Sequence, residues 1–162
     1  MSYKIEKPLS IEERANFIVE YNHNQGLLIE ETDLAMYALE PWELLEGDEV
    51  VDNTEAWQAE QKQKEKERIA TLYLTGADVE RGIYQAKGMD FDDILALVTQ
   101  LQPEELDIKG LKIELKANHF YRGNPYVNAI GQLLGFTEEQ LDKFFETNDY
   151  KALVSEVFNL NE

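Results

Sequence analysis

The chain has 162 residues, of which 43% are hydrophobic and 10% aromatic, enough for the core of one ordinary domain or of two very small ones. Its formal net charge of −18 argues against a nucleic-acid partner, because phosphate binding depends on Lys and Arg displacing counterions. The lack of cysteine excludes disulfides, thiolate metal sites and a cysteine nucleophile. No apolar run approaches the length of a membrane span and the first residues lack the apolar part of a signal peptide, so we expect a soluble protein, made in a cytoplasm, with no membrane partner.

A helix is predicted over about residues 11–25. Ser10 and Glu13 have the spacing of a capping box, and Gly26 can end the helix in a left-handed conformation. The periodicity predicts one apolar face, widened by two aromatic residues. The members of that face are Ile11, Ala15, Ile18, Val19 and Asn22, with Phe17 and Tyr21 beside them.

Short apolar runs follow and predict strands. Residues 27–29 and 34–39 are too short for typical helices, and Pro41 ends the second run. Residues 42–45 and 49–52 flank Glu46-Gly47-Asp48, where Gly47 suits the first central position of a tight hairpin turn. Residues 1–53 are therefore predicted to form an α+β module with one helix and a small antiparallel sheet of three or four strands.

A long polar helix is predicted over residues 54–74. Residues 60–68, EQKQKEKER, contain no apolar side chain, so this segment has nothing to bury against a core. Pairs such as Glu60/Lys64 and Glu65/Arg68 contribute only a few tenths of a kcal/mol each. We expect a connector that is helical because its apolar ends anchor it, spanning roughly 30 Å at 1.5 Å per residue.

Residues 75–162 predict a module of four to six short α-helices. Helix starts are indicated at Thr75, Asp90, Asn124-Pro125 and Thr137, each with a side chain able to cap the first turn. A last amphipathic turn runs from Tyr150 towards Val157. Residues 104–118 are ambiguous, because Ile108, Leu111 and Leu115 fit a helix whereas Lys109-Gly110 argues for a break.

No pattern indicates catalysis, a metal or a cofactor. The two histidines, His23 and His119, lie far apart in the sequence and in unlike contexts. The acidic runs at 90–93 and 46–55 are explained by helix starts and a hairpin tip, where carboxylates complement free backbone amides, and neither has the pattern of a calcium loop. We therefore expect a protein that is not an enzyme and has neither a metal site nor a cofactor.

Two groups of aromatic and charged residues are candidates for partner contacts. Phe120-Tyr121-Arg122 precedes the turn at Asn124-Pro125; exposed, these residues form an interaction hot spot, and buried, the two aromatic residues are ordinary core. Trp42 and Trp57 raise the same alternatives in the first module.

Three segments resemble small accessory proteins of tailed bacteriophages and prophages. They are Glu20-Tyr21-Asn22-His23-Asn24-Gln25-Gly26-Leu27, Ala35-Met36-Tyr37-Ala38-Leu39-Glu40 and Gly47-Asp48-Glu49-Val50-Val51-Asp52, followed by a charged helix. The resemblance covers about residues 8–60. Leu74-Thr75-Gly76-Ala77-Asp78-Val79 and Tyr121-Arg122-Gly123-Asn124-Pro125 are also similar to parts of such proteins, which are usually encoded in the tail, baseplate or fibre region.

The resemblance implies a structural or adaptor protein of the tail or baseplate, located in the virion tail or in the host cytoplasm during assembly. Its partners would be tail, baseplate or fibre proteins, and self-association is also open. Two alternatives are an assembly chaperone that the virion does not retain and an acidic decoy that inhibits a host defence protein.

The residues expected to contact a partner are Trp42, Val50, Val51, Trp57, Tyr121 and Arg122. A sheet edge can also accept a further strand, and we expect Pro in place of Val51, if that strand is the edge, to abolish such binding without loss of the fold.

Overall fold

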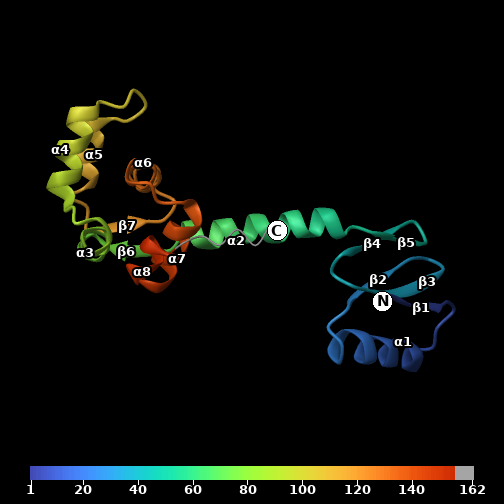
Figure 1. The fold of residues 1–162 in the computed structure, drawn as a ribbon. Helices are drawn as coiled ribbons and strands as arrows, with labels where there is room; N and C mark the ends of the chain where they lie inside the picture. The colour runs from blue at the N-terminus through green and yellow to red at the C-terminus, as the bar shows by residue number, and fades with distance from the viewer. Residues whose placement is uncertain (156–162) are drawn as a thin grey trace. The chain divides into compact units, whose positions relative to one another are not determined.

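A computed structural model describes residues 1–155 and shows an α+β fold with small antiparallel sheets (Figure 1). The chain divides into two compact units, Met1–Lys64 and Glu65–Glu162. The division falls inside helix α2 (Thr54–Ala70), so this helix contributes residues to both units, whereas the sequence suggested a separate connector.

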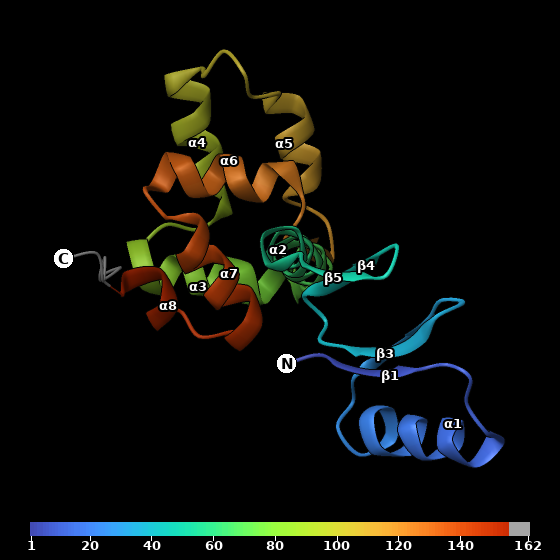
Figure 2. The ribbon, with the colours of Figure 1, turned by 90° about the vertical axis from the view of Figure 1, so that its right-hand side faces the viewer.

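In the N-terminal unit, a three-stranded antiparallel sheet has helical turns on one face and a β-hairpin on the other (Figures 1 and 2). The strand order is β1 (Tyr3–Glu6), β3 (Ala35–Leu39), β2 (Leu28–Glu31), and β1 was not predicted. The hairpin pairs β4 (Glu43–Glu46) with β5 (Glu49–Asp52) as a sheet of its own. The hairpin is therefore not part of one four-stranded sheet.

The first helix begins as predicted, with a complete Ser10–Glu13 capping box. It consists of α1 (Ile11–Ile18) and a π-helical turn, η1 (Val19–His23). Its predicted apolar face is partly wrong, because Ile11 is 90% and Val19 is 47% exposed whereas Phe17 is buried. The Phe17 ring packs at a tilt against Tyr21, and burial of these two large rings against the sheet determines the rotation of the helix in place of the aliphatic stripe.

Helix α2 contains no buried residue, in agreement with its polar sequence. The predicted ion pairs Glu60/Lys64 and Glu65/Arg68 are present, at 2.6 and 2.7 Å. The helix ends at Ala70, four residues before the predicted end, because Tyr73–Thr75 form strand β6. Leu74 in this strand pairs with Phe120 and is buried, so a pairing distant in sequence overrides the local helical periodicity.

Up to residue 155, the C-terminal unit packs six short helices around a two-stranded sheet of β6 (Tyr73–Thr75) and β7 (His119–Tyr121). The helices are α3 (Gly76–Lys87), α4 (Phe91–Leu101), α5 (Ile108–Glu114), α6 (Pro125–Leu134), α7 (Glu138–Thr147) and α8 (Lys151–Val154). Thr75, Asp90, Asn124 and Thr137 cap helices as predicted, and Gly88, with φ of 71°, caps the C-terminus of α3. Val157, expected in the last helix, lies outside the described residues.

The ambiguous segment 104–118 contains helix α5, in which Gly110 occupies the first turn. Asp107 caps this helix by accepting a hydrogen bond from the Gly110 amide. A Cβ on Gly110 would overlap the Tyr126 hydroxyl and the Asp107 carboxylate. Glycine is therefore required here by close packing, and it does not mark a break in the helix.

A close approach of the same kind at Gly82 yields a stability prediction. A Cβ at this position of α3 would penetrate the ring of Phe144, which is fully buried. Gly82→Ala should lower the free energy of unfolding by about 1–2 kcal/mol, because overpacking costs about 1–3 kcal/mol and better helix propensity offsets up to about 1 kcal/mol. Chemical denaturation would measure this loss. In a Phe144→Leu background the loss should be smaller, and equal losses in both backgrounds would contradict the assignment of the clash.

Candidate interaction surface

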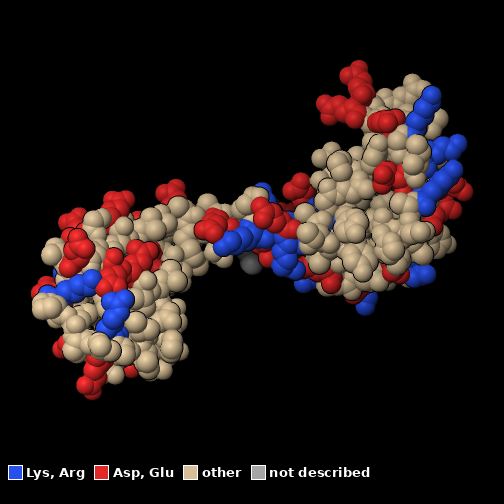
Figure 3. Space-filling model, turned by 180° about the vertical axis from the view of Figure 1, so that it is seen from behind, with Lys and Arg blue, Asp and Glu red and all other residues tan. Residues whose placement is uncertain are grey.

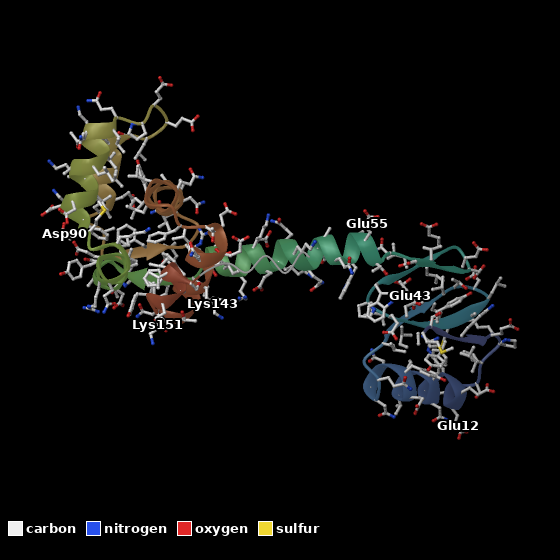
Figure 4. All side chains as sticks on the ribbon, in the orientation of Figure 1. Glu12, Glu43, Glu55, Asp90, Lys143 and Lys151 are labelled. Carbon is white, nitrogen blue, oxygen red and sulfur yellow. The ribbon has the colours of Figure 1, made fainter. Side chains whose placement is uncertain are left out.

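Four of the six predicted contact residues lie in the N-terminal unit, at the junction of the hairpin with helix α2. The rings of Trp42 and Trp57 meet edge to face, with centroids 5.7 Å apart. Val50 and Val51 follow on β5, the strand that leads into this helix. Figure 4 labels Glu43 and Glu55 on either side of this junction. The structure therefore brings together residues that the sequence could only name separately.

The hairpin has the two-residue turn that the sequence predicts. Glu46 pairs with Glu49 across the loop, and Gly47 has φ of 60°, as the first central position of a type II′ turn requires. Three hydrogen bonds hold the hairpin in place. The Tyr37 hydroxyl donates to the Asp48 carbonyl, the Thr32 hydroxyl donates to the Asp48 carboxylate, and the Asn53 amide donates to the Trp42 carbonyl.

The strand pleat gives the hairpin an inner and an outer face. Leu45 and Val50 form the inner face and pack against β3. Leu44 and Val51 are cross-strand neighbours on the opposite face, where Leu44 is 43% exposed. Trp42, which is 37% exposed, lies in the turn just before β4, and its ring contacts that of Trp57 at the start of α2. We call Trp42, Leu44, Val51 and the adjoining Trp57 the outer face.

This arrangement changes the assignment of two residues. The side chain of Val50, predicted as a contact, faces the core of its own unit. Leu44 was not predicted, although its two-residue spacing from Trp42 and its position before the glycine turn were visible in the sequence. What the sequence could not show is which of Leu44 and Leu45 faces outward.

The register also determines which backbone groups of β5 are available to another chain. The backbone N–H of Asn53 donates to the Trp42 carbonyl. Hydrogen-bonded pairs alternate with non-hydrogen-bonded pairs along an antiparallel ladder, so Leu44 and Val51 form the next hydrogen-bonded pair. The backbone groups of Val50 and Asp52 then point away from β4. Pro at Val51 would remove an amide that bonds to β4 and so break the hairpin itself. The expectation that Val51→Pro would leave the fold intact is therefore wrong.

The last two predicted residues, Tyr121 and Arg122, lie in the C-terminal unit. Tyr121 is 55% exposed and lies beside Tyr73, whose ring also contacts that of His119. Phe120, which lies between His119 and Tyr121 in β7, is buried, because neighbouring side chains of a strand alternate between its two faces. Phe120 is therefore a core residue, whereas Tyr121 lies on the surface.

Arg122 is a structural residue, which corrects its prediction as a contact. It is 6% exposed, and its guanidinium donates to Asp142 at 2.6 Å, to the Asn128 side chain at 2.5 Å and to the Glu138 carbonyl. These bonds tie the end of β7 to helices α6 and α7. A guanidinium held by three internal acceptors is not available to a partner.

Other features of the described residues do not indicate a reactive centre. The enclosed void in the C-terminal core is small and lined by apolar side chains such as Phe91, Phe120 and Phe144. His23 and His119 lie in different units. Across residues 1–155 no group of three His, Asp or Glu side chains could hold a metal ion. Over the same range no helix is both long and apolar enough to cross a membrane.

The contacts of Arg122 predict that it stabilises the C-terminal unit. Arg122→Ala should lower the free energy of unfolding by about 2–4 kcal/mol, because it leaves Asp142 and Asn128 without their donor in a mostly buried site. Arg81→Ala, which removes an exposed ion pair to Asp78, is a control with an expected loss of less than about 0.5 kcal/mol. Chemical denaturation would measure the free energy of unfolding of both variants. Similar losses would contradict the structural role of Arg122.

A charged cluster on the N-terminal unit predicts a dependence of stability on pH. Arg14 and Lys7 both contact the Glu31 carboxylate, and their hydrogen bonds lower its pKa from 4.5 to about 2. Since the folded pKa is depressed, the stabilisation is complete above the unfolded pKa and is lost as the pH falls towards 2. Glu31→Gln should therefore melt below wild type at neutral pH, and the two melting temperatures should converge between about pH 4.5 and 2. Glu30→Gln removes the adjacent, exposed carboxylate and should melt close to wild type throughout. A Glu31→Gln difference that stays constant with pH would contradict the prediction.

Comparison with protein-family models, with curated proteins and with solved structures found no match to this chain.

Proposed function

We propose that this protein is a non-enzymatic adaptor that acts through protein–protein contacts, with the outer face as its principal contact surface. One observation carries the proposal: Trp42 and Leu44 are both exposed at the hairpin, where Trp42 contacts Trp57 and Leu44 is the cross-strand neighbour of Val51. Clustered exposed apolar side chains mark interaction surfaces, and tryptophan is among the residues most often found at binding hot spots.

The hairpin is suited to binding without rearrangement. Its inner face is packed against β3, and hydrogen bonds from Thr32 and Tyr37 hold its turn. These contacts fix the hairpin backbone that carries the outer face, which reduces the entropy lost on binding.

We further propose the tail or baseplate region of a phage particle as the setting. The segments that resemble phage accessory proteins build the elements behind this surface. Residues 35–40 contain β3, and residues 47–52 contain the hairpin turn and β5. A built-in adaptor and an assembly chaperone would use the outer face in the same way and differ in whether the particle retains the chain. A tail-fibre or baseplate protein is the expected partner in both cases.

Quantitative mass spectrometry of purified particles tests the proposal. We expect the chain at a fixed ratio to the tail-tube protein if it is an adaptor. If it is a chaperone, the chain should be absent from particles but bound to a tail or fibre protein in the lysate. Binding only to a basic host protein would instead support the acidic decoy and overturn the proposal.

Two matched variants test the surface. Leu44→Ser should reduce incorporation or partner binding by at least about thirtyfold, which corresponds to a hot-spot contribution of about 2 kcal/mol. Leu28→Ser is the control, because Leu28 is a similarly exposed leucine, at 51%, on strand β2 of the same unit. Both variants should retain the circular dichroism spectrum of the wild type. Equal effects of the two substitutions would exclude the outer face as the contact.

A further inference from the structure

The hairpin has an unusual charge distribution, which indicates the chemistry of its partner. No Lys or Arg occurs between Arg14 and Lys62, and seven acidic residues lie between positions 40 and 55. They are Glu40, Glu43, Glu46, Asp48, Glu49, Asp52 and Glu55. In the view of Figure 3, acidic side chains are spread over the N-terminal unit. The apolar outer face therefore lies among carboxylates.

Few positive charges of the described residues balance these acids. The N-terminal amine of Met1 pairs with Glu40 at 2.9 Å. Lys4 lies over the Tyr37 ring, and its ammonium pairs with Glu6. Among residues 1–155, no Lys or Arg forms an ion pair with the other six carboxylates of the hairpin region.

At the hairpin turn the charges oppose folding. Glu46 and Glu49 face each other directly across the strands, with Asp48 in the turn between them. Like charges at directly opposed positions destabilise an antiparallel pair. A cationic partner would relieve this repulsion when it binds.

The same charges disfavour a second copy of this chain as the occupant of the hairpin. A symmetric dimer places the same patch of both copies face to face. Here that would bring two sets of carboxylates together without a basic residue among residues 40–55 to compensate them. Self-association through this surface is therefore disfavoured.

The edge of β5 offers a backbone template beside the outer face. In the described residues β5 pairs only with β4, and the backbone groups of Val50 and Asp52 point outward. An open concavity is lined by Val50, Val51 and Asp52 of this strand together with Ser2, Trp42, Glu43 and Thr54. An extended segment placed there can continue the sheet with main-chain hydrogen bonds.

We infer that the partner binds as an added β-strand along β5 and that the bound segment has two central apolar residues flanked by Lys or Arg. This inference rests on the proposed function and specifies the partner at the β5 edge beside the outer face, with Val51 common to both. Strand β5 reads Glu49-Val50-Val51-Asp52, so its charges lie at both ends and its apolar residues in the middle. The complementary segment is Lys-Val-Val-Lys, and because this pattern is symmetric it fits β5 in the parallel and in the antiparallel direction.

Synthetic peptides test this inference with the full-length chain. The probe is acetyl-Thr-Lys-Val-Val-Lys-Thr-amide. A control peptide of equal charge and composition carries Val-Lys-Lys-Val at its centre, and a second control carries Glu-Val-Val-Glu. In ¹⁵N NMR titrations we expect the probe to shift the amide signals of Val50 and Asp52 and to bind at least about threefold more tightly than either control. Binding of the probe should weaken as salt rises from about 0.05 M to about 0.5 M, because screening reduces attraction between exposed charges.

Charge reversal at Glu49 separates loss of binding from loss of folding. Glu49→Lys replaces the opposed like charges by a favourable pair with Glu46, so its melting temperature should rise by roughly 1–5 °C. The same variant should bind the probe at least about threefold more weakly than wild type. Glu12→Lys makes the same charge change on α1, which covers the opposite face of the sheet (Figure 4), and should leave binding of the probe unchanged.

Three outcomes would overturn the inference. They are no shift at Val50 and Asp52 with about 5 mM probe, equal binding of the Val-Lys-Lys-Val control, and equal binding by Glu49→Lys and wild type. If one of them occurs while Leu44→Ser still prevents incorporation, the inference fails but the proposed function stands. If Leu44→Ser also has no effect, both fail.

Discussion

Strand β3 determines how the N-terminal unit packs, because every residue from Ala35 to Leu39 is buried. Side chains of a strand alternate between its faces, so five consecutive apolar residues require cover on both sides. Helix α1 and turn η1 cover Met36 and Ala38, and the β4–β5 hairpin covers Ala35, Tyr37 and Leu39. Once Leu45 and Val50 face this core, Leu44 and Val51 must face outward. The exposed outer face is thus a direct consequence of how the hairpin packs.

The hairpin combines firm attachment with unfavourable charge. Asp48 is held by Thr32 and Tyr37, yet Glu46 and Glu49 repel each other beside it. A sequence selected for stability alone would place opposite charges at this pair. Retaining like charges at the turn is understandable if the surface is complete only with a cationic partner, since proteins commonly sacrifice some stability at functional sites.

The C-terminal unit is organised by local signals at its helix ends and by the buried guanidinium of Arg122. Thr75, Asp90 and Thr137 satisfy free amides at the starts of their helices. Arg122 then joins β7 to helices α6 and α7 through Asp142, Asn128 and the Glu138 carbonyl. The exposed rings of Tyr73, His119 and Tyr121 form a second aromatic surface, but nothing in the structure indicates what would cover it.

The sequence by itself determined the fold class, most helix starts, the polar character of α2 and the hairpin turn at Gly47. Each of these depends on neighbouring residues: a cap and its amide, a period of apolar positions, or a glycine that accepts positive φ. Only the tertiary structure decided that residues 73–75 form a strand, that Gly110 lies inside a helix and that Arg122 is internal. These depend on residues distant in the chain, since β6 needs β7, Gly110 contacts Tyr126 and Arg122 needs Asp142. The outer face belongs to the same class, because a one-residue change in strand orientation exchanges Leu44 for Leu45 at the surface.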